Sequence, residues 1–97
     1  MLGVKTIVIP KEITCIDDWA FNSCENLEGI ELPEGLGSIG WMAFAGCRKL
    51  KSITLDEKVT RIGEDAFVNC RKLTIIGKAG SYAEQYAKNN NIPFEAK

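Results

Sequence analysis

The stretch IELPEGLGSIGWMAFAGCRKLKS, residues 30–52, decides the fold, because its apolar positions recur on both sides of it. The segment before it, residues 7–29, reads IVIPKEITCIDDWAFNSCENLEG, and the segment after it, residues 53–75, reads ITLDEKVTRIGEDAFVNCRKLTI. The three segments start 23 residues apart. A fixed period of this size is typical of a solenoid, in which repeated units stack along one axis.

Aligned by this period, the shared positions are apolar and form columns that we expect to run through one core. A single unit cannot bury its apolar face alone, so neighbouring units must cover each other. We predict that Ile7, Ile30, Ile53 and Ile76 open successive units. The other columns are Ile9/Leu32/Leu55, Ile13/Leu36/Val59, Ile16/Ile39/Ile62, Ala20/Ala43/Ala66, Phe21/Phe44/Phe67, Cys24/Cys47/Cys70 and Leu27/Leu50/Leu73.

Each unit contains two short strand patterns and one short turn region. Residues 27–32 alternate between apolar and polar side chains, which predicts a half-buried strand that pairs in parallel with its copies. Residues 36–40 alternate over a shorter length and predict a second small strand. Residues 41–46 have room for only one or two helical turns before Gly46 and the following loop.

The composition is that of one small globular domain. The chain has 97 residues, of which 45% are hydrophobic and 26% charged. Its net charge of −1 gives no electrostatic basis for binding nucleic acid, and no apolar run is long enough to predict membrane insertion. The start MLGVKTIVIP lacks the features of a signal peptide. We therefore expect a cytoplasmic location if the chain is complete as given, and a secreted or cell-surface location if it is part of a longer protein.

The repeated pattern resembles the BspA-like (treponemal-type) leucine-rich repeat family, whose unit is similar to L-x-x-I-x-I-P-x-x-V-x-x-I-G-x-x-A-F-x-x-C. Residues 27–47 match this unit at nearly every position, and the resemblance covers residues 1–75. It implies an α/β leucine-rich repeat solenoid that binds other macromolecules, often on bacterial surfaces, and that has no catalytic residues. We expect a single domain of residues 1–97, divided into the end of a truncated repeat (1–6), full repeats (7–29, 30–52 and 53–75) and a C-terminal cap (76–97).

The segment 77–96 is also similar to the terminal cap that is common in this family, and its residues predict a capping helix. Ser81 followed by Glu84 is a capping box, in which each side chain bonds a free backbone N–H group at the helix start. The residues Tyr82, Ala83, Tyr86 and Ala87 would then form one face over the last repeat. Asn89–Asn91 should end the helix, and residues 92–94 should return as an extended segment.

The chemistry of the chain offers little for catalysis or for binding a metal or a cofactor. The four cysteines, Cys15 and the column Cys24/Cys47/Cys70, lack the paired spacing of a zinc site, and the chain has no histidine. We expect small buried free thiols, although disulfides between adjacent units are within reach. The carboxylates Asp17, Asp18, Glu64 and Asp65 fall on solvent-facing turns. We therefore predict no enzyme activity, no metal and no cofactor.

Two surfaces are candidates for binding a protein or glycan partner. The outward strand positions, expected to form a concave face, carry small and mixed side chains: Val8, Glu31, Ser52, Thr54 and Glu34. The second surface contains both tryptophans of the chain, Trp19 and Trp41, together with Met42. Either each indole lies flat over its neighbour to cover the core, or the group is a partly exposed contact site, where tryptophan is enriched.

Two roles follow from these surfaces. The first is a non-catalytic interaction module, and the second is a structural C-terminal segment that closes a longer leucine-rich repeat surface protein. The N-terminal strand has no preceding unit to pair with, so we also expect self-association, as a homodimer or oligomer, through an edge formed by Leu2, Val4, Ile7 and Ile9.

Overall fold

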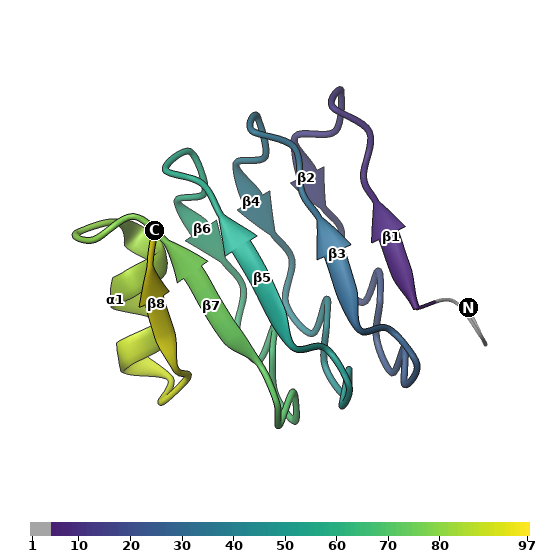
Figure 1. Cartoon of the computed structure of the whole chain (residues 1–97). Helices are drawn as coiled ribbons and strands as arrows, with labels where there is room; N and C mark the ends of the chain where they lie inside the picture. The colour runs from purple at the N-terminus through teal and green to yellow at the C-terminus, as the bar shows by residue number, and fades with distance from the viewer. Residues whose placement is uncertain (1–4) are drawn as a thin grey trace.

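A computed structural model describes residues 5–97, so Leu2 and Val4 of the predicted edge lie outside the described residues. The main feature is a five-stranded parallel sheet, with one strand near the start of each full repeat and two strands from the C-terminal part of the chain (Figure 1). Its strands, in spatial order, are β1 (Thr6–Val8), β3 (Gly29–Glu31), β5 (Ser52–Leu55), β7 (Thr74–Gly77) and β8 (Phe94–Ala96). The predicted stacking of units is therefore confirmed.

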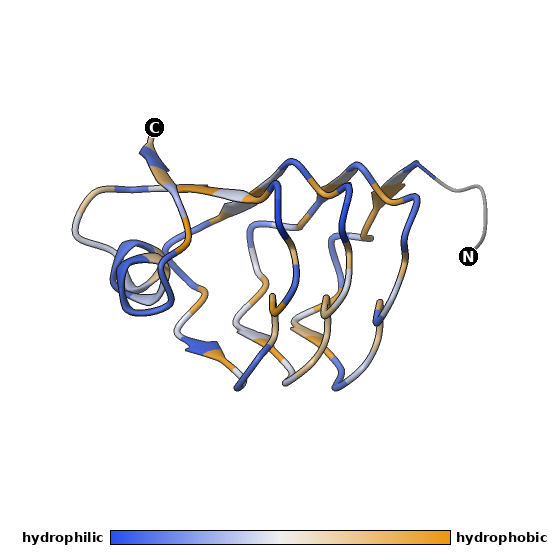
Figure 2. Cartoon of the chain, turned by 90° about the horizontal axis from the view of Figure 1, so that it is seen from below, coloured by the Kyte–Doolittle hydropathy of each residue, from blue (hydrophilic) through white to orange (hydrophobic). Residues whose placement is uncertain are grey.

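A second, smaller sheet lies opposite the first and is built from the second strand of each unit. It contains β2 (Cys15–Ile16), β4 (Ser38–Ile39) and β6 (Arg61–Ile62), again all parallel. The pairing of Ile16 with Ile39 and of Ile39 with Ile62 keeps the 23-residue step. The chain thus forms a solenoid of parallel strands whose core is made of the apolar columns. Figure 2 shows hydrophobic stretches, in orange, recurring along the successive turns of the solenoid.

Burial in the core rises from the first unit to the second. Phe44 lies between the rings of Phe21 and Phe67, with ring centroids 5.3 Å apart on each side. Phe44 is fully buried, whereas Phe21 is only half-buried. Ile13 and Ala20 of the first unit are exposed, although their counterparts Leu36/Val59 and Ala43/Ala66 are buried. These two residues were predicted to be core, but among the described residues no unit covers their outer side.

The predicted helical turns at residues 41–46 are instead a series of tight turns. Met42 has a positive φ of 60°, and its counterparts Trp19 and Asp65 have φ values of 66° and 56°. A left-handed residue interrupts a right-handed helix, so only bonds between residues three apart form within the segment, such as Ala45 N–H to the Met42 carbonyl. The remaining N–H groups are free to reach the next unit.

The step from the third unit to the cap is one residue shorter than predicted. Ile53 pairs with Ile75, and Thr54 pairs with Ile76, so Ile75 rather than Ile76 continues the first core column. Ile75 is fully buried, while Ile76 is partly exposed on the other face of the sheet. The cause is local, because Leu73 and Ile75 are separated by one residue where Leu50 and Ile53 are separated by two.

The cap consists of helix α1 (Tyr82–Asn89) and strand β8, which pairs in parallel with β7. The Ser81 hydroxyl accepts a hydrogen bond from the Glu84 N–H, as predicted, at 3.4 Å. The Glu84 carboxylate accepts from the Gly80 N–H at 2.8 Å rather than from Ser81, and this bond holds the pKa of Glu84 below its ordinary value. Ala83 and Ala87 are buried against the last repeat. Within residues 5–97, α1 and every other described segment fall short of a membrane-spanning helix.

Two glycines allow the units to approach closely on the turn side. A side chain on Gly40 would collide with the backbone of Asp18, and one on Gly63 would collide with the backbone of Trp41. The first unit has Asp17 at this position. Glycine is therefore required wherever one unit packs against the turn of the unit before it.

Candidate functional site

Trp19 and Trp41 form an exposed aromatic pair on the stacked turns. Their ring centroids are 5.5 Å apart with planes at 66°, an edge-to-face contact. Trp19 is 49% exposed and Trp41 48%, so about half of each side chain is accessible to solvent. A hydrogen bond of 3.2 Å from the Trp19 N–H to the Trp41 carbonyl fixes their backbones in adjacent units. Met42 lies beside them and is half-buried.

Carboxylates of the first and third units lie on the same stacked turns as this pair. The Asp18 Oδ1 accepts a hydrogen bond of 3.0 Å from the Trp41 N–H, and Asp17 accepts from the Cys15 thiol at 3.6 Å. Glu64 and Asp65 line a shallow hollow together with Trp41 and Met42. In the described part of the chain, none of these four carboxylates forms an ion pair with a lysine or an arginine. We call Trp19, Trp41, Met42 and the four carboxylates the tryptophan face.

The predicted concave-face residues lie on the outer face of the five-stranded sheet. Val8, Glu31 and Thr54 are exposed there, while the residues that alternate with them point into the core. Ser52 is half-buried and Glu34 is exposed in the turn after β3. Ile76 and Glu95 pair with each other and extend this row, since Thr54 pairs with Ile76. Sequence analysis missed both because it placed Ile76 in the core column.

The edge predicted for self-association is described only in part. Ile7 and Ile9 are half-buried and pack against the core. Ile9 donates its N–H to the Glu31 carbonyl, and the Lys5 carbonyl accepts from Gly29, so the odd-numbered residues bond to β3. In a parallel ladder, the backbone groups of the alternate residues Thr6 and Val8 then face away from β3. Over residues 5–97, β3 is the only strand that pairs with β1.

The cysteine column forms hydrogen bonds from its thiols to backbone carbonyls of the preceding units. The thiol of Cys47 donates to the Phe21 carbonyl at 3.2 Å, and that of Cys70 donates to the Phe44 carbonyl at 3.0 Å. All four cysteines are free thiols. The contact with the Cys47 thiol, together with burial, raises the pKa of Cys70 well above its ordinary value of 9.0. Cys70 is therefore a neutral thiol near physiological pH, which is the unreactive form.

The polar side chains of the described residues lie at the surface. Between residues 5 and 97 no polar or charged residue is buried, and no cluster of three metal-ligating side chains occurs. Asp17, Asp18, Glu64 and Asp65 are exposed on turns.

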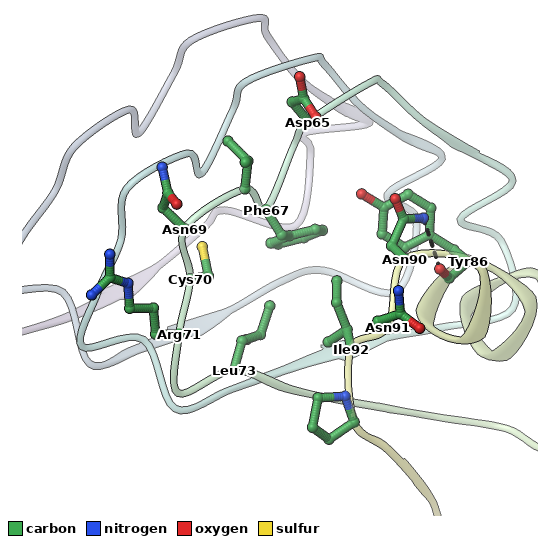
Figure 3. A pocket seen from close by; sticks show the side chains of 12 residues that line it. Asp65, Phe67, Asn69, Cys70, Arg71, Leu73, Tyr86, Asn90, Asn91 and Ile92 are labelled. Carbon is green, nitrogen blue, oxygen red and sulfur yellow. Dashed lines mark hydrogen bonds between the residues drawn. The ribbon is translucent and has the colours of Figure 1, made fainter.

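A hollow between the third unit and the cap was not predicted (Figure 3). Its volume is about 480 Å³, and it lies between the segment from Asp65 to Leu73, most of which lines it, and the cap, which contributes Tyr86 and residues 90–93. The sequence feature that indicates this hollow is the short length of the cap. After β7 the chain forms α1 and β8 but no further turn segment, so the turn stack ends at the third unit.

Comparison with known proteins identifies one family. The family model described as "BspA type Leucine rich repeat region (6 copies)" matches residues 2–90. No curated protein and no solved structure matches the chain.

Proposed function

Because the chain belongs to the BspA-type leucine-rich repeat family, we propose that it is a non-catalytic interaction module whose tryptophan face binds a partner protein. The observation that carries this proposal is the half-exposed Trp19–Trp41 pair. Tryptophan is the residue most enriched among interface hot spots, and two adjacent indoles present a large rigid apolar surface.

The charge around the pair favours a partner with lysine or arginine side chains. A cation over an indole face gains about 0.5–2 kcal/mol, depending on how far it is desolvated. Asp18 and Glu64 lie next to Trp41 without a cationic partner among the described residues. A neutral glycan could stack on the indoles, but it would leave these carboxylates unpaired. A basic protein segment satisfies both parts of the surface.

Intrinsic fluorescence provides a direct test, because both tryptophans of the chain lie in this face. The probe is the peptide acetyl-Gly-Lys-Gly-Arg-Gly-amide, and the control is acetyl-Gly-Glu-Gly-Glu-Gly-amide. We expect a saturable change in emission with the basic peptide alone, which weakens as the salt concentration rises. Trp41→Ala should weaken binding, whereas Thr54→Ala on the sheet face should not. An equal response to the acidic peptide, or none to the basic one, contradicts the proposal.

A second role, the closing of a longer solenoid, is favoured by the cap. Strand β8 pairs with β7, and α1 buries Ala83 and Ala87 against the last repeat, so the C-terminal end of the core is covered. Asp17 favours the first role. A unit stacked in the same way before the first repeat would meet the Asp17 side chain, whereas Gly40 and Gly63 leave space at the equivalent positions of the later repeats. Mass spectrometry of the mature protein separates the two, since additional 23-residue units before residue 1 would support the closing role.

A further inference from the structure

Backbone hydrogen bonds join the units in the turn stack as well as in the two sheets, and those of the turn stack run in one direction. In the first unit, the N–H groups of alternate residues donate to carbonyls of the second unit: Trp19 to Trp41 (3.2 Å), Phe21 to Ala43 (2.7 Å) and Ser23 to Ala45 (2.6 Å). The second unit repeats the pattern toward the third: Met42 to Glu64 (3.2 Å), Phe44 to Ala66 (2.7 Å) and Gly46 to Val68 (2.8 Å). Each unit therefore presents three N–H groups toward the C-terminal end.

Within residues 5–97, the cap provides hydrogen-bond partners for the backbone of the last unit in the two sheets but not in the turn stack. Strand β8 pairs with β7 in the first sheet. In the second sheet, the Tyr82 hydroxyl accepts the Ile62 N–H at 3.1 Å, in place of a further strand. In the turn stack, the three N–H groups that the pattern directs outward belong to Asp65, Phe67 and Asn69. Within residues 5–97, these groups have no acceptor.

These three residues line the hollow of about 480 Å³ between the third unit and the cap. Its apolar lining residues include Leu73 and Ile92, and the ring of Tyr86 packs edge-on to Phe67 with centroids 6.1 Å apart. Arg71 and Asn91 contribute polar side chains (Figure 3). The hollow thus occupies the position where a fourth turn segment would lie.

We propose that this hollow binds a short acidic peptide segment of a partner protein, whose carbonyls at alternate residues accept from Asp65, Phe67 and Asn69. The chain itself provides the precedent, because the equivalent donors of the second unit bind three carbonyls of one segment, residues 64–68. Main-chain hydrogen bonds to an unpaired backbone row are a common mode of peptide recognition. An apolar side chain of the peptide would cover Leu73 and Ile92.

Charge determines which peptide the hollow prefers and in which direction the peptide lies. Aligned N–H groups form the positive end of a row of peptide dipoles, which favours an anionic ligand. Arg71 adds a full charge at the Asn69 end, and among residues 5–97 it has no carboxylate partner, whereas Arg48 pairs with Glu25 at 3.3 Å. Asp65 lies at the other end. A segment parallel to residues 64–68 would therefore carry its acidic residue toward its C-terminus.

Amide NMR tests this site independently of the tryptophan face. The probe is acetyl-Ala-Leu-Ala-Leu-Asp-amide, and the control peptide carries Lys in place of Asp. We expect saturable shifts of the amide signals of Asp65, Phe67 and Asn69 with the acidic peptide. The equivalent amides of Met42, Phe44 and Gly46 are already hydrogen-bonded and should stay unchanged.

Two matched variants test the role of charge. Arg71→Glu should weaken binding by at least about tenfold, because it replaces an attractive charge with a repulsive one. Lys72→Glu makes the same change in charge at an exposed neighbour that does not line the hollow, and it should bind as the unmodified chain does. Three results overturn the proposal: no shift of the three amides, the same shifts with sodium acetate alone, or shifts that follow protein concentration without peptide, which would indicate a second copy in the hollow.

Discussion

Phe44 and Phe21 have the same repeat position and different surroundings. Phe44 has a stacked ring on both sides, with Phe21 and Phe67 each at 5.3 Å. Phe21 has only Phe44 and stays half-buried. The same substitution at these two positions therefore measures how much burial, rather than side-chain chemistry, contributes to stability.

We expect Phe44→Ala to lower the free energy of unfolding by about 3–5 kcal/mol, because it removes a fully buried ring and leaves a cavity. Phe21→Ala should cost clearly less, since part of its ring is already in water. Urea denaturation of both variants measures the difference. A loss below about 1 kcal/mol for Phe44→Ala would mean that the repeat register is wrong.

One hydroxyl group of the cap helix takes the place of a further strand in the second sheet. Tyr82 reaches from the first turn of α1 to β6, where its oxygen accepts the Ile62 N–H at 3.1 Å. Tyr86 continues the aromatic column at the same end, and burial raises its pKa to about 12. One helix thus covers the last phenylalanine and completes the second sheet.

Removing this hydroxyl should destabilise the end of the second sheet. We expect Tyr82→Phe to cost about 0.5–1.5 kcal/mol, the usual net value of one hydrogen bond, and to speed hydrogen exchange at the Ile62 amide. Tyr86→Phe is the matched control, because the Tyr86 hydroxyl makes no hydrogen bond with described residues. Exchange at Ile62 that is equally fast in both variants would argue against the capping role.

The elements that repeat could be predicted from the sequence, and those that depend on a single departure from the repeat could not. The strands followed from the alternation of Ile30 and Leu32 and their copies. The left-handed φ of Met42 was missed, because methionine is not a residue that marks this conformation. The register of β7 was missed because Ile75 and Ile76 are both isoleucines, so losing one residue left the apolar pattern intact.

The candidate site was predictable to a similar extent. The repeat period placed Trp19 and Trp41 on adjacent units, but their edge-to-face packing depends on rotamers that the period does not determine. The hollow beside Arg71 was not predicted, because it results from hydrogen bonds that the cap fails to make.

At the scale of the whole molecule, we propose that the chain self-associates through β1. Within residues 5–97, the outward backbone groups of Thr6 and Val8 pair with no other strand, and Val8 is 69% exposed. Two copies related by a two-fold axis can pair these rows antiparallel and close the assembly.

Val8→Pro should shift the chain toward monomer, because proline removes an outward N–H while the bonds from β1 to β3 are made by residues 5, 7 and 9. Val8→Thr keeps that N–H and serves as the control. Light scattering at micromolar concentration measures the mass, and circular dichroism verifies the fold. A monomeric unmodified chain, or a Val8→Pro variant that still dimerises, would rule out this edge.

Because the interface between neighbouring units is repeated, the length of such molecules can change by whole units. The junction of the first and second units repeats the junction of the second and third in strand register, turn bonds and glycine contact. Neighbouring parallel strands lie about 4.8 Å apart, so each inserted unit lengthens the stack by one such increment and leaves its cross-section unchanged. The length of a binding surface on this scaffold can therefore change only in fixed steps. Duplication of a whole unit changes the distance that the surface spans, while the residues at its two ends keep their contacts.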